Sequence, residues 1–364
     1  MVPDHLVFIT LVLNFFNNLI GRFSKDIGID LGTANTLVFV KDLGIVINEP
    51  SVVAINARND QIFAVGRDAR DMIGKTPPHL SVIKPLTKGV ISDFEVTEKM
   101  LKYFIDQIHR DSKTLVPRPR VVIGVPPEIT EVERKAVEDA VFSAGAREVF
   151  LVEEPMLAAI GARLPVAEAV GTLIVDIGGG TTDIAVISLA GVVTWKSLPI
   201  AGDELNKNII TYSRDIFNLL LGERQAELVK MRVGSAIPQE EVLSMEMRGR
   251  DLLSGLPKEI IVTDSQIRDA INRSIRTIVE NVKATLEVTP PELVADIYER
   301  GIVLTGGGAL LRGFDKLLAH ETAIPVRVAD DPLTCVVRGA GMLLDNNELL
   351  RDVSLPSSRE GGIV

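Results

Sequence analysis

The sequence predicts an α/β fold of two similar lobes, and two observations carry this prediction. Short apolar segments alternate with segments of helical period along most of the 364 residues, as in layered α/β proteins. The pattern D-x-G-x-x-x-T occurs twice, beginning at Asp30 and again at Asp176, 146 residues further on. A repeat at this distance indicates an internal duplication, so we expect two similar lobes that face each other.

Residues 1–24 precede the first predicted strand and are expected to contact a membrane. No formally charged side chain lies between Asp4 and Arg22, but three asparagines and a glycine interrupt the apolar run. A transmembrane helix needs about 20 predominantly apolar residues, so a span is not expected. An amphipathic helix on a membrane surface fits better. Two alternatives stay open: a helix packed on the protein body, and a start codon placed too early, which would make residues 1–13 artefactual.

The first half of the chain contains strands and helices in alternation. Apolar runs bounded by Gly and Pro indicate strands, and a period of 3.6 indicates helices. The expected elements are a strand at 27–30, a strand at 36–40, a helix at 98–109, a strand at 120–125, a helix at 131–144 and a strand at 149–152.

The second half repeats this pattern with one long interruption. Residues 202–261 are more polar and irregular, which suggests an inserted subdomain. The other expected elements are a strand at 172–177, a strand at 182–188, a helix at 266–288, a strand at 302–304 and a helix at 309–318.

Composition excludes several classes of function. Lys and Arg number 39 and Asp and Glu number 49, a net charge of −10, whereas nucleic-acid-binding proteins usually carry a basic excess. A single cysteine, Cys335, cannot form an internal disulfide. The four histidines lie far apart and show no zinc-type spacing. The P-loop pattern is absent, and no G-x-G-x-x-G joins a strand to a helix, so neither a P-loop nor a dinucleotide fold is expected.

Three glycine-bearing turns, each after a predicted strand, indicate a nucleotide site. Glycine lets backbone N–H groups approach phosphate closely and form an anion-binding nest. Asp30 and Asp176 stand just before the first two turns and are expected to hold Mg²⁺, directly or through its waters. The third run, Gly306-Gly307-Gly308, suits the flat approach of an adenine ring or a ribose. Any one run is weak evidence, but ordinary turn chemistry does not predict the repetition.

These motifs resemble those of the actin and sugar-kinase superfamily of ATPases, and within it those of the MreB family of bacterial actins. Residues 30–36 resemble the first phosphate motif, residues 176–182 the second and residues 304–312 the adenosine motif. Shorter stretches at 48–54, 153–156 and 290–293 are also similar to the family. The resemblance runs from residue 26 to residue 350.

The resemblance implies an actin-like fold of the duplicated, ribonuclease H-like kind, with a nucleotide cleft between two lobes that each carry a smaller inserted subdomain. It implies the following division: residues 1–24 as the membrane-contact segment, residues 25–47, 81–167 and 335–364 as subdomain IA, residues 48–80 as IB, residues 168–199 and 262–334 as IIA, and residues 200–261 as IIB.

The resemblance also implies roles for single residues. Glu154 and Thr181 would position the attacking water, Glu227 would contact the ribose and Lys230 the adenine side. The backbone of two turns would bind ATP phosphates, through Gly32, Thr33, Ala34 and Asn35 in the first and Gly178, Gly179, Gly180 and Thr181 in the second. Two positions depart from the family pattern: Asp183 replaces the usual Glu, and Asn206 replaces an acid whose role is left in doubt.

The implied function is that of a slow, Mg²⁺-dependent ATPase that polymerises into paired antiparallel filaments and directs rod cell shape by organising cell-wall synthesis. The expected location is cytoplasmic, on the inner face of the membrane, with membrane-embedded shape and wall-synthesis proteins as partners and no nucleic acid. Val132 is the candidate for the contact between filament strands. Three alternatives remain: a small-molecule kinase of the same superfamily, a chaperone-type ATPase, for which the chain ends too soon, and a scaffold that binds ATP without hydrolysis.

Overall fold

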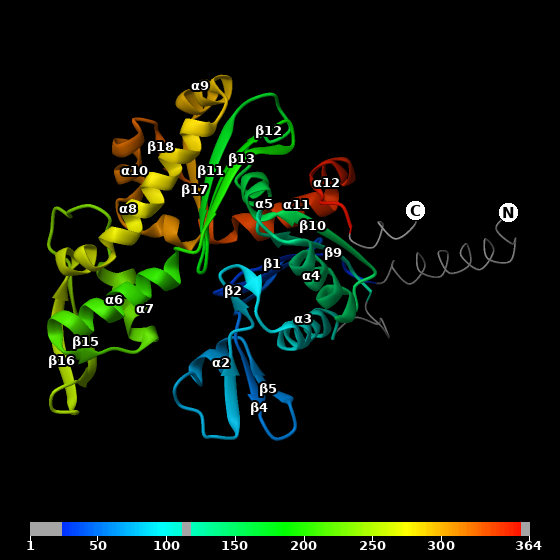
Figure 1. The fold of residues 1–364 in the computed structure, drawn as a ribbon. Coiled ribbons are helices and arrows are strands. Elements are labelled where there is room, and N and C mark those ends of the chain that lie inside the picture. Colours follow the sequence, from blue (N-terminus) through cyan, green and yellow to red (C-terminus); the bar gives the residue numbers. More distant parts are fainter. Residues whose placement is uncertain (1–23, 111–117, 358–364) are drawn as a thin grey trace, which may run out of the picture. The chain divides into compact units, whose positions relative to one another are not determined.

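The computed structural model describes residues 24–110 and 118–357, and these form two compact units (Figure 1). The first contains the chain up to Val125, then Ile129–Glu153 and the chain from Ala340 on; the second contains Pro126–Glu128 and Glu154–Gly339. The membrane-contact segment predicted at residues 1–24 lies almost wholly outside the described residues. The division into four subdomains stays a prediction.

The first unit is built on a five-stranded sheet in the order β10-β9-β1-β2-β3. β1 pairs antiparallel with β2 and β2 with β3, whereas β1, β9 and β10 run parallel. Parallel neighbours require crossover segments, and helices supply them here. The bounds are β1 Ile27–Leu31, β2 Asn35–Val40, β3 Gly44–Pro50, β9 Arg120–Val125 and β10 Glu148–Glu153.

Two helices cover this sheet and bury its apolar face. Asp93 caps the helix at Phe94–His109, and Thr130 caps the helix at Glu131–Ser143 through a capping box with Glu133. These caps satisfy N–H groups that have no partner inside the helix. Met100, Phe104 and Ile105 are buried against the strands. The helices of the unit are α2 Arg67–Asp71, α3 Phe94–His109, α4 Glu131–Ser143 and α12 Asn347–Val353, with α11 Cys335–Asp345 entering from the second unit. Its short strands are β4 Val53–Asn56, β5 Gln61–Val65, β6 Leu80–Ile83, β7 Leu86–Thr87 and β8 Val90–Ile91.

The second unit repeats the topology of the first. Its sheet has the order β13-β12-β11-β17-β18, with three antiparallel strands followed by two parallel additions. Even an irregularity of register recurs, between Val38 and Phe39 in one sheet and between Val186 and Ile187 in the other. The predicted duplication is therefore confirmed at the level of topology. The bounds are β11 Thr172–Ile177, β12 Thr182–Ser188, β13 Gly191–Leu198, β17 Ile302–Thr305 and β18 Val326–Val328.

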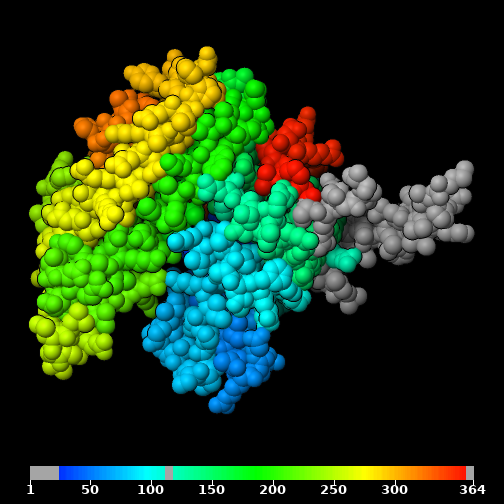
Figure 2. Space-filling model, in the orientation of Figure 1, coloured from blue at the N-terminus to red at the C-terminus, as the bar shows by residue number. Residues whose placement is uncertain are grey.

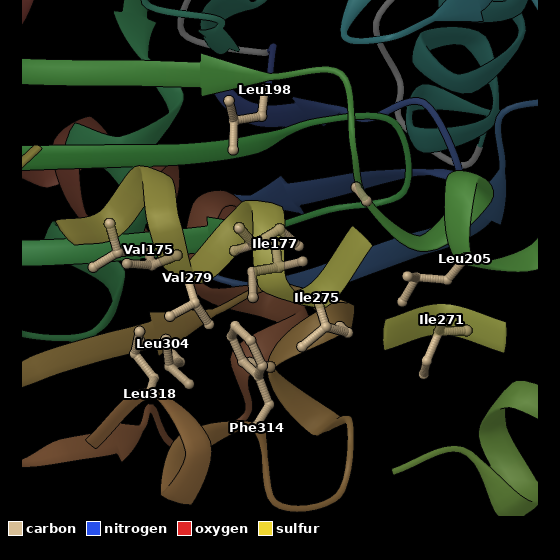
Figure 3. Packing of buried hydrophobic residues seen from close by; sticks show 14 of the residues in the cluster. Val175, Ile177, Leu198, Leu205, Ile271, Ile275, Val279, Leu304, Phe314 and Leu318 are labelled. Carbon is tan, nitrogen blue, oxygen red and sulfur yellow. The ribbon is translucent and has the colours of Figure 1, made fainter. Parts of the chain in front are cut away.

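A long amphipathic helix, α8 Asp264–Val288, packs its apolar side on this sheet. Figure 3 shows Ile275 and Val279 of α8 beside Ile177 of β11, with Phe314 and Leu304 completing the cluster. The outer side of α8 lies on the surface as a long ridge in Figure 2. The remaining helices of this part are α5 Glu154–Gly161, α9 Pro291–Arg300, η1 Gly307–Leu310, α10 Phe314–Thr322 and η2 Pro332–Thr334.

The polar stretch at 202–261 is regular, so its description as irregular was wrong. It contains α6 Gly202–Phe217, α7 Glu223–Val233 and a three-stranded antiparallel sheet of β14 Leu219–Leu220, β15 Ser244–Asp251 and β16 Pro257–Thr263. The misreading arose because many outward-facing positions are charged, while the buried positions of α6 still follow a helical period.

A helix is present near the one predicted at 309–318, but the predicted bounds were wrong, because α10 covers Phe314–Thr322. Gly313 has φ = +71° and divides this stretch into η1 and α10. A Cβ at Gly313 would lie 2.4 Å from Cγ1 of Ile237, so the turn is also sterically closed to other residues. Within residues 24–110 and 118–357, no helix has the length and apolarity needed to cross a membrane.

Candidate functional site

The second glycine turn (residues 178–181) joins the buried strands β11 and β12. The N–H of Gly178 donates to the carbonyl of Thr181 at 2.9 Å, which closes the turn. Two backbone carbonyls of the turn face α6: the N–H of Gly202 donates to Gly178 O at 3.2 Å and the N–H of Asp203 to Gly179 O at 2.8 Å. Backbone hydrogen bonds therefore close the turn and join its first two residues to the start of α6.

A row of polar side chains crosses the sheet beside this turn. In register, Thr305 of β17 is next to Asp176 of β11, Asp176 is opposite Asp183 of β12, and Asp183 is opposite Ser197 of β13. The Oδ1 atoms of both aspartates are buried and make no hydrogen bond to any described residue. A buried carboxylate oxygen that accepts no hydrogen bond destabilises the folded state unless a cation or another ligand binds to it.

Burial raises the pKa of both carboxyl groups. The pKa of Asp176 rises to about 7, chiefly because the side chain is desolvated, and the charge of Asp183 adds to the rise while the nearby Thr305 opposes it. Desolvation also raises the pKa of Asp183 to about 6, with Ser197 and Thr181 opposing and Glu128 adding. Asp183 was noted from the sequence only as a departure from a motif; its burial beside Asp176 could not be read there.

This donor set fits a magnesium ion. Mg²⁺ prefers oxygen ligands and is usually held by one or two carboxylates together with water and phosphate. A cation beside Asp176 would compensate the unpartnered oxygen that burial leaves there. Among the described residues no group of three or more His, Cys, Asp or Glu side chains is arranged to hold a metal.

The third glycine run lies directly against the end of β11. Gly306 has φ = +77°, and its N–H donates to Pro332 O at 2.9 Å. A Cβ at Gly306 would lie 2.3 Å from Ile177 O and 2.9 Å from Asp176 Oδ1, and one at Gly308 would lie 2.1 Å from Cγ2 of Ile177. The structure therefore brings Gly306, Gly307 and Gly308 together with Asp176, and both contacts require glycine.

Lys230 and Glu227 lie on α7 and differ in burial. Lys230 is largely buried, and its ammonium donates to the carbonyl of Gly202 at 2.8 Å. Desolvation lowers its pKa, while Glu227, Asp203 and Glu223 oppose the shift. Glu227 is exposed one helical turn earlier. The sequence offered no signal for the Lys230–Gly202 hydrogen bond, because it joins residues 28 positions apart.

Glu154 and Thr181 come from neighbouring elements of the second unit. Glu154 is the first residue of α5 and is 9% exposed. α5 packs on β11 and β12, the two strands that Thr181 and its turn connect. Both predicted water-positioning residues thus belong to elements of the second unit that pack against each other.

The first glycine turn (residues 32–35) belongs to the first unit, together with Asp30. Ser51 supports it: its hydroxyl donates to Gly32 O at 2.6 Å and lies 2.9 Å from the hydroxyl of Thr36. Thr33 Oγ1 accepts from the N–H of Gly89 at 2.9 Å. Sequence reasoning did not assign a role to Ser51 or Gly89, because they bind the turn from distant segments.

A family model described as "MreB/Mbl protein" matches residues 24–352 of the chain. The chain is 54% identical over 331 residues to the "Cell shape-determining protein MreB" of Escherichia coli K12, covering 89% of this chain and 94% of that protein. It is 49% identical over 328 residues to the "Cell shape-determining protein Mbl" of Bacillus subtilis 168, covering 90% and 98%.

Solved structures agree with the sequence comparisons. The crystal structure of MreB5 of Spiroplasma citri bound to ADP superposes with a TM-score of 0.85 at 37% identity, covering 91% of this chain and 98% of that one. The MamK double helical filament matches with a TM-score of 0.75 at 24% identity, covering 89% and 99%, and supports the fold alone.

Proposed function

This chain belongs to the MreB/Mbl family and has the actin-like fold predicted from its motifs, and on that premise we propose that it is a nucleotide-dependent cytoskeletal protein that determines cell shape. The observation that carries the proposal is the buried Asp176 beside two glycine turns, with an Oδ1 atom that has no partner among the described residues. The matched relatives are cell shape-determining proteins. The alternative of a small-molecule kinase is therefore set aside.

ATP with Mg²⁺ is the proposed ligand. Backbone N–H groups of Gly179 and Gly180 bind phosphate oxygens in the turn that the N–H of Gly178 closes, and Asp176 holds the metal ion or its waters. Gly306, Gly307 and Gly308 accept the adenosine, with Glu227 and Lys230 on its other side. Bound Mg²⁺ neutralises phosphate charge that the amides alone cannot. Support comes from the relative of known structure that binds ADP and from the fit of the Asp176 donor set.

The first unit contributes through its own turn in this proposal. Asp30 precedes Gly32, Thr33, Ala34 and Asn35 as Asp176 precedes the second turn, and the two sheets share one topology. The same chemistry therefore suits both turns, and Asp30 is the second proposed ligand of the metal ion.

Hydrolysis is proposed to depend on Glu154 and Thr181. The Glu154 carboxylate orients the attacking water or takes its proton, and the Thr181 hydroxyl fixes the water by a hydrogen bond. A carboxylate is a weak base at neutral pH, so turnover is slow and suits a timer of filament lifetime.

Release of phosphate during assembly tests this role. Wild type, Glu154→Ala and the matched exposed variant Glu241→Ala are compared for phosphate release and for ATP-dependent pelleting. We expect Glu154→Ala to pellet with ATP but to release phosphate at least about tenfold more slowly, since general base catalysis contributes about 10²-fold or more, and Glu241→Ala to behave as wild type. Equal rates in all three would remove Glu154 from the mechanism.

Self-association into paired antiparallel filaments at the inner membrane face completes the proposal. Residues 1–23 supply the anchor, and membrane-embedded shape and wall-synthesis proteins are the partners. The test is flotation with liposomes, in the presence of ATP, of the full chain and of a chain beginning at Ser24, because filaments alone pellet and do not float. The full chain is expected to float with the vesicles and the shortened one to stay at the bottom of the gradient; equal flotation would exclude the segment as anchor.

A further inference from the structure

The start of α6 is capped by the second glycine turn instead of by a side chain. Ala201 occupies the N-cap and supplies no side-chain hydrogen bond. Gly178 O and Gly179 O take that place by accepting from the N–H groups of Gly202 and Asp203. Helix N-termini leave their first N–H groups without partners, so this arrangement satisfies two of them.

The same two hydrogen bonds orient the opposite side of the turn. In a planar trans peptide the C=O and the following N–H point in opposite directions. Fixing the carbonyls of Gly178 and Gly179 toward α6 therefore directs the N–H groups of Gly179 and Gly180 away from the helix. Those N–H groups are the ones assigned above to phosphate.

Lys230 holds the first turn of α6 in this position. Its Nζ donates to Gly202 O at 2.8 Å. A Cβ added at Gly202 would lie 3.3 Å from that Nζ, 3.4 Å from Gly178 O and 3.6 Å from the Cα of Gly179. Gly202 thus lies close to both the Lys230 ammonium and the glycine turn, and a Cβ there would crowd the ammonium and make ordinary van der Waals contact with the turn.

The helix that carries Lys230 is itself fixed at its C-terminal end. The N–H of Gly234 donates to Lys230 O at 2.9 Å, and Arg312 Nη1 donates to the carbonyls of Met231 at 3.1 Å and Gly234 at 3.3 Å. α7 also packs on β15 of the small sheet. A displacement of the glycine turn would therefore displace Gly202 and Lys230, and with them the elements α6 to β16 at residues 202–263.

We propose that Lys230 is a positioning residue for phosphate binding. It holds the start of α6 against the carbonyls of Gly178 and Gly179, and so orients the N–H groups of the second glycine turn toward phosphate. It also connects this turn to the inserted subdomain. This inference rests on the proposed function and goes beyond the contact with the adenine side expected for Lys230. A contact with the base alone would leave the binding of a ligand without a base unaffected.

The test measures binding of the triphosphate part and of the adenosine part of ATP separately. Wild type, Lys230→Met and Lys207→Met are compared; Lys207 also lies near the start of α6, but it is exposed and pairs with Glu204 at 3.7 Å. Affinities for Mg-tripolyphosphate and for adenosine are obtained from the dependence of Tm on ligand concentration. We expect Lys230→Met to bind Mg-tripolyphosphate about tenfold more weakly, as the loss of a hydrogen bond to a charged group suggests, and Lys207→Met to match wild type.

A second measurement needs no variant and holds even if Lys230→Met fails to fold. Hydrogen exchange of the Gly202 and Asp203 amides in wild type is followed with and without Mg-tripolyphosphate. Slower exchange with this ligand is expected, because phosphate would tighten the turn that accepts from these amides.

The outcomes separate the two claims. Wild-type affinity of Lys230→Met for Mg-tripolyphosphate, with weakened adenosine binding, would overturn the positioning role and leave the proposed function intact. Unchanged exchange at Gly202 and Asp203 in a wild type that binds the ligand would overturn it as well. A wild type that binds neither ATP nor Mg-tripolyphosphate would contradict the proposed function itself.

Discussion

Replacing Asp176 by Asn should stabilise the free protein and disable it. The Asp176 side chain is buried, its Oδ1 has no partner among the described residues, and its pKa rises from 3.8 to about 7. The carboxyl group of Asp176 therefore binds its proton more tightly in the folded chain than in the unfolded chain. The contribution of the protonated carboxyl to stability is complete below pH 4 and is lost as the pH rises through 7.

The size of the effect follows from the two pKa values. The raised pKa of Asp176 lowers the free energy of unfolding by about 2 kcal/mol at pH 5 and about 4 kcal/mol at pH 8, at about 1.36 kcal/mol for each pH unit between the two pKa values. Asn does not ionise and avoids this cost. The free energy of unfolding of Asp176→Asn should exceed that of wild type, by about 2 to 3 kcal/mol more at pH 8 than at pH 5.

Urea denaturation without nucleotide and with EDTA measures this difference. A parallel titration with Mg-ATP should show that Asp176→Asn has lost nucleotide-dependent stabilisation, because the metal ion has lost a carboxylate. Asp106→Asn, an exposed site, is the control and should show little dependence on pH. The same advantage at pH 5 and pH 8, or a destabilised Asp176→Asn at pH 8, would refute the reasoning.

Three further predictions concern the turn, the first sheet and the surface. Gly306→Ala should destabilise the chain by about 2 kcal/mol or more, because φ is +77° and the added Cβ would lie 2.3 Å from Ile177 O. The control Gly255→Ala, where φ is +76° but the space is open, should lower the free energy of unfolding by about 1 kcal/mol. Equal losses of stability in urea denaturation would contradict this. Asp26→Ala should cost about 3 kcal/mol, since it leaves Arg120 and Arg147, which contact Asp26 at 3.3 Å and 3.2 Å, without their shared carboxylate in a partly buried site; thermal unfolding near wild type would contradict it. Val132→Glu, at a side chain that is 79% exposed, should change stability by less than about 0.5 kcal/mol but abolish paired filaments in electron microscopy; paired filaments would exclude α4 from the contact between strands.

The strands and turns were predictable because their signals are local. The strand–turn–strand units at 27–40 and 172–188 appear where expected, since apolar alternation and a glycine tip act over a few residues. The bounds of the helix predicted at 309–318 were wrong because Gly313 adopts a positive φ and α10 begins only after it. Ile237, more than 70 residues earlier in the sequence, packs beside Gly313, and that contact could not be predicted from local pattern.

The candidate site also contains residues that the sequence could identify and environments that it could not. Asp176 and the glycine turns could be named from motifs, because phosphate and metal chemistry requires particular residue types in a particular order, whereas Lys230 was implied only by the family resemblance. The environment of Asp183 could not, since its burial depends on strands β11, β12 and β13 lying side by side. The support of the first turn by Ser51 likewise depends on strand pairing between β2 and β3.

The amino-acid sequence by itself determined the duplicated α/β plan, the family and the residues that we propose to bind a nucleotide, because each depends on sequence pattern and residue type. Only the tertiary structure decided that Asp176 and Asp183 lose their water, that Gly306 touches the end of β11 and that Lys230 reaches Gly202. Desolvation and hydrogen bonding between distant segments are properties of packed elements, and no spacing along a single chain encodes them.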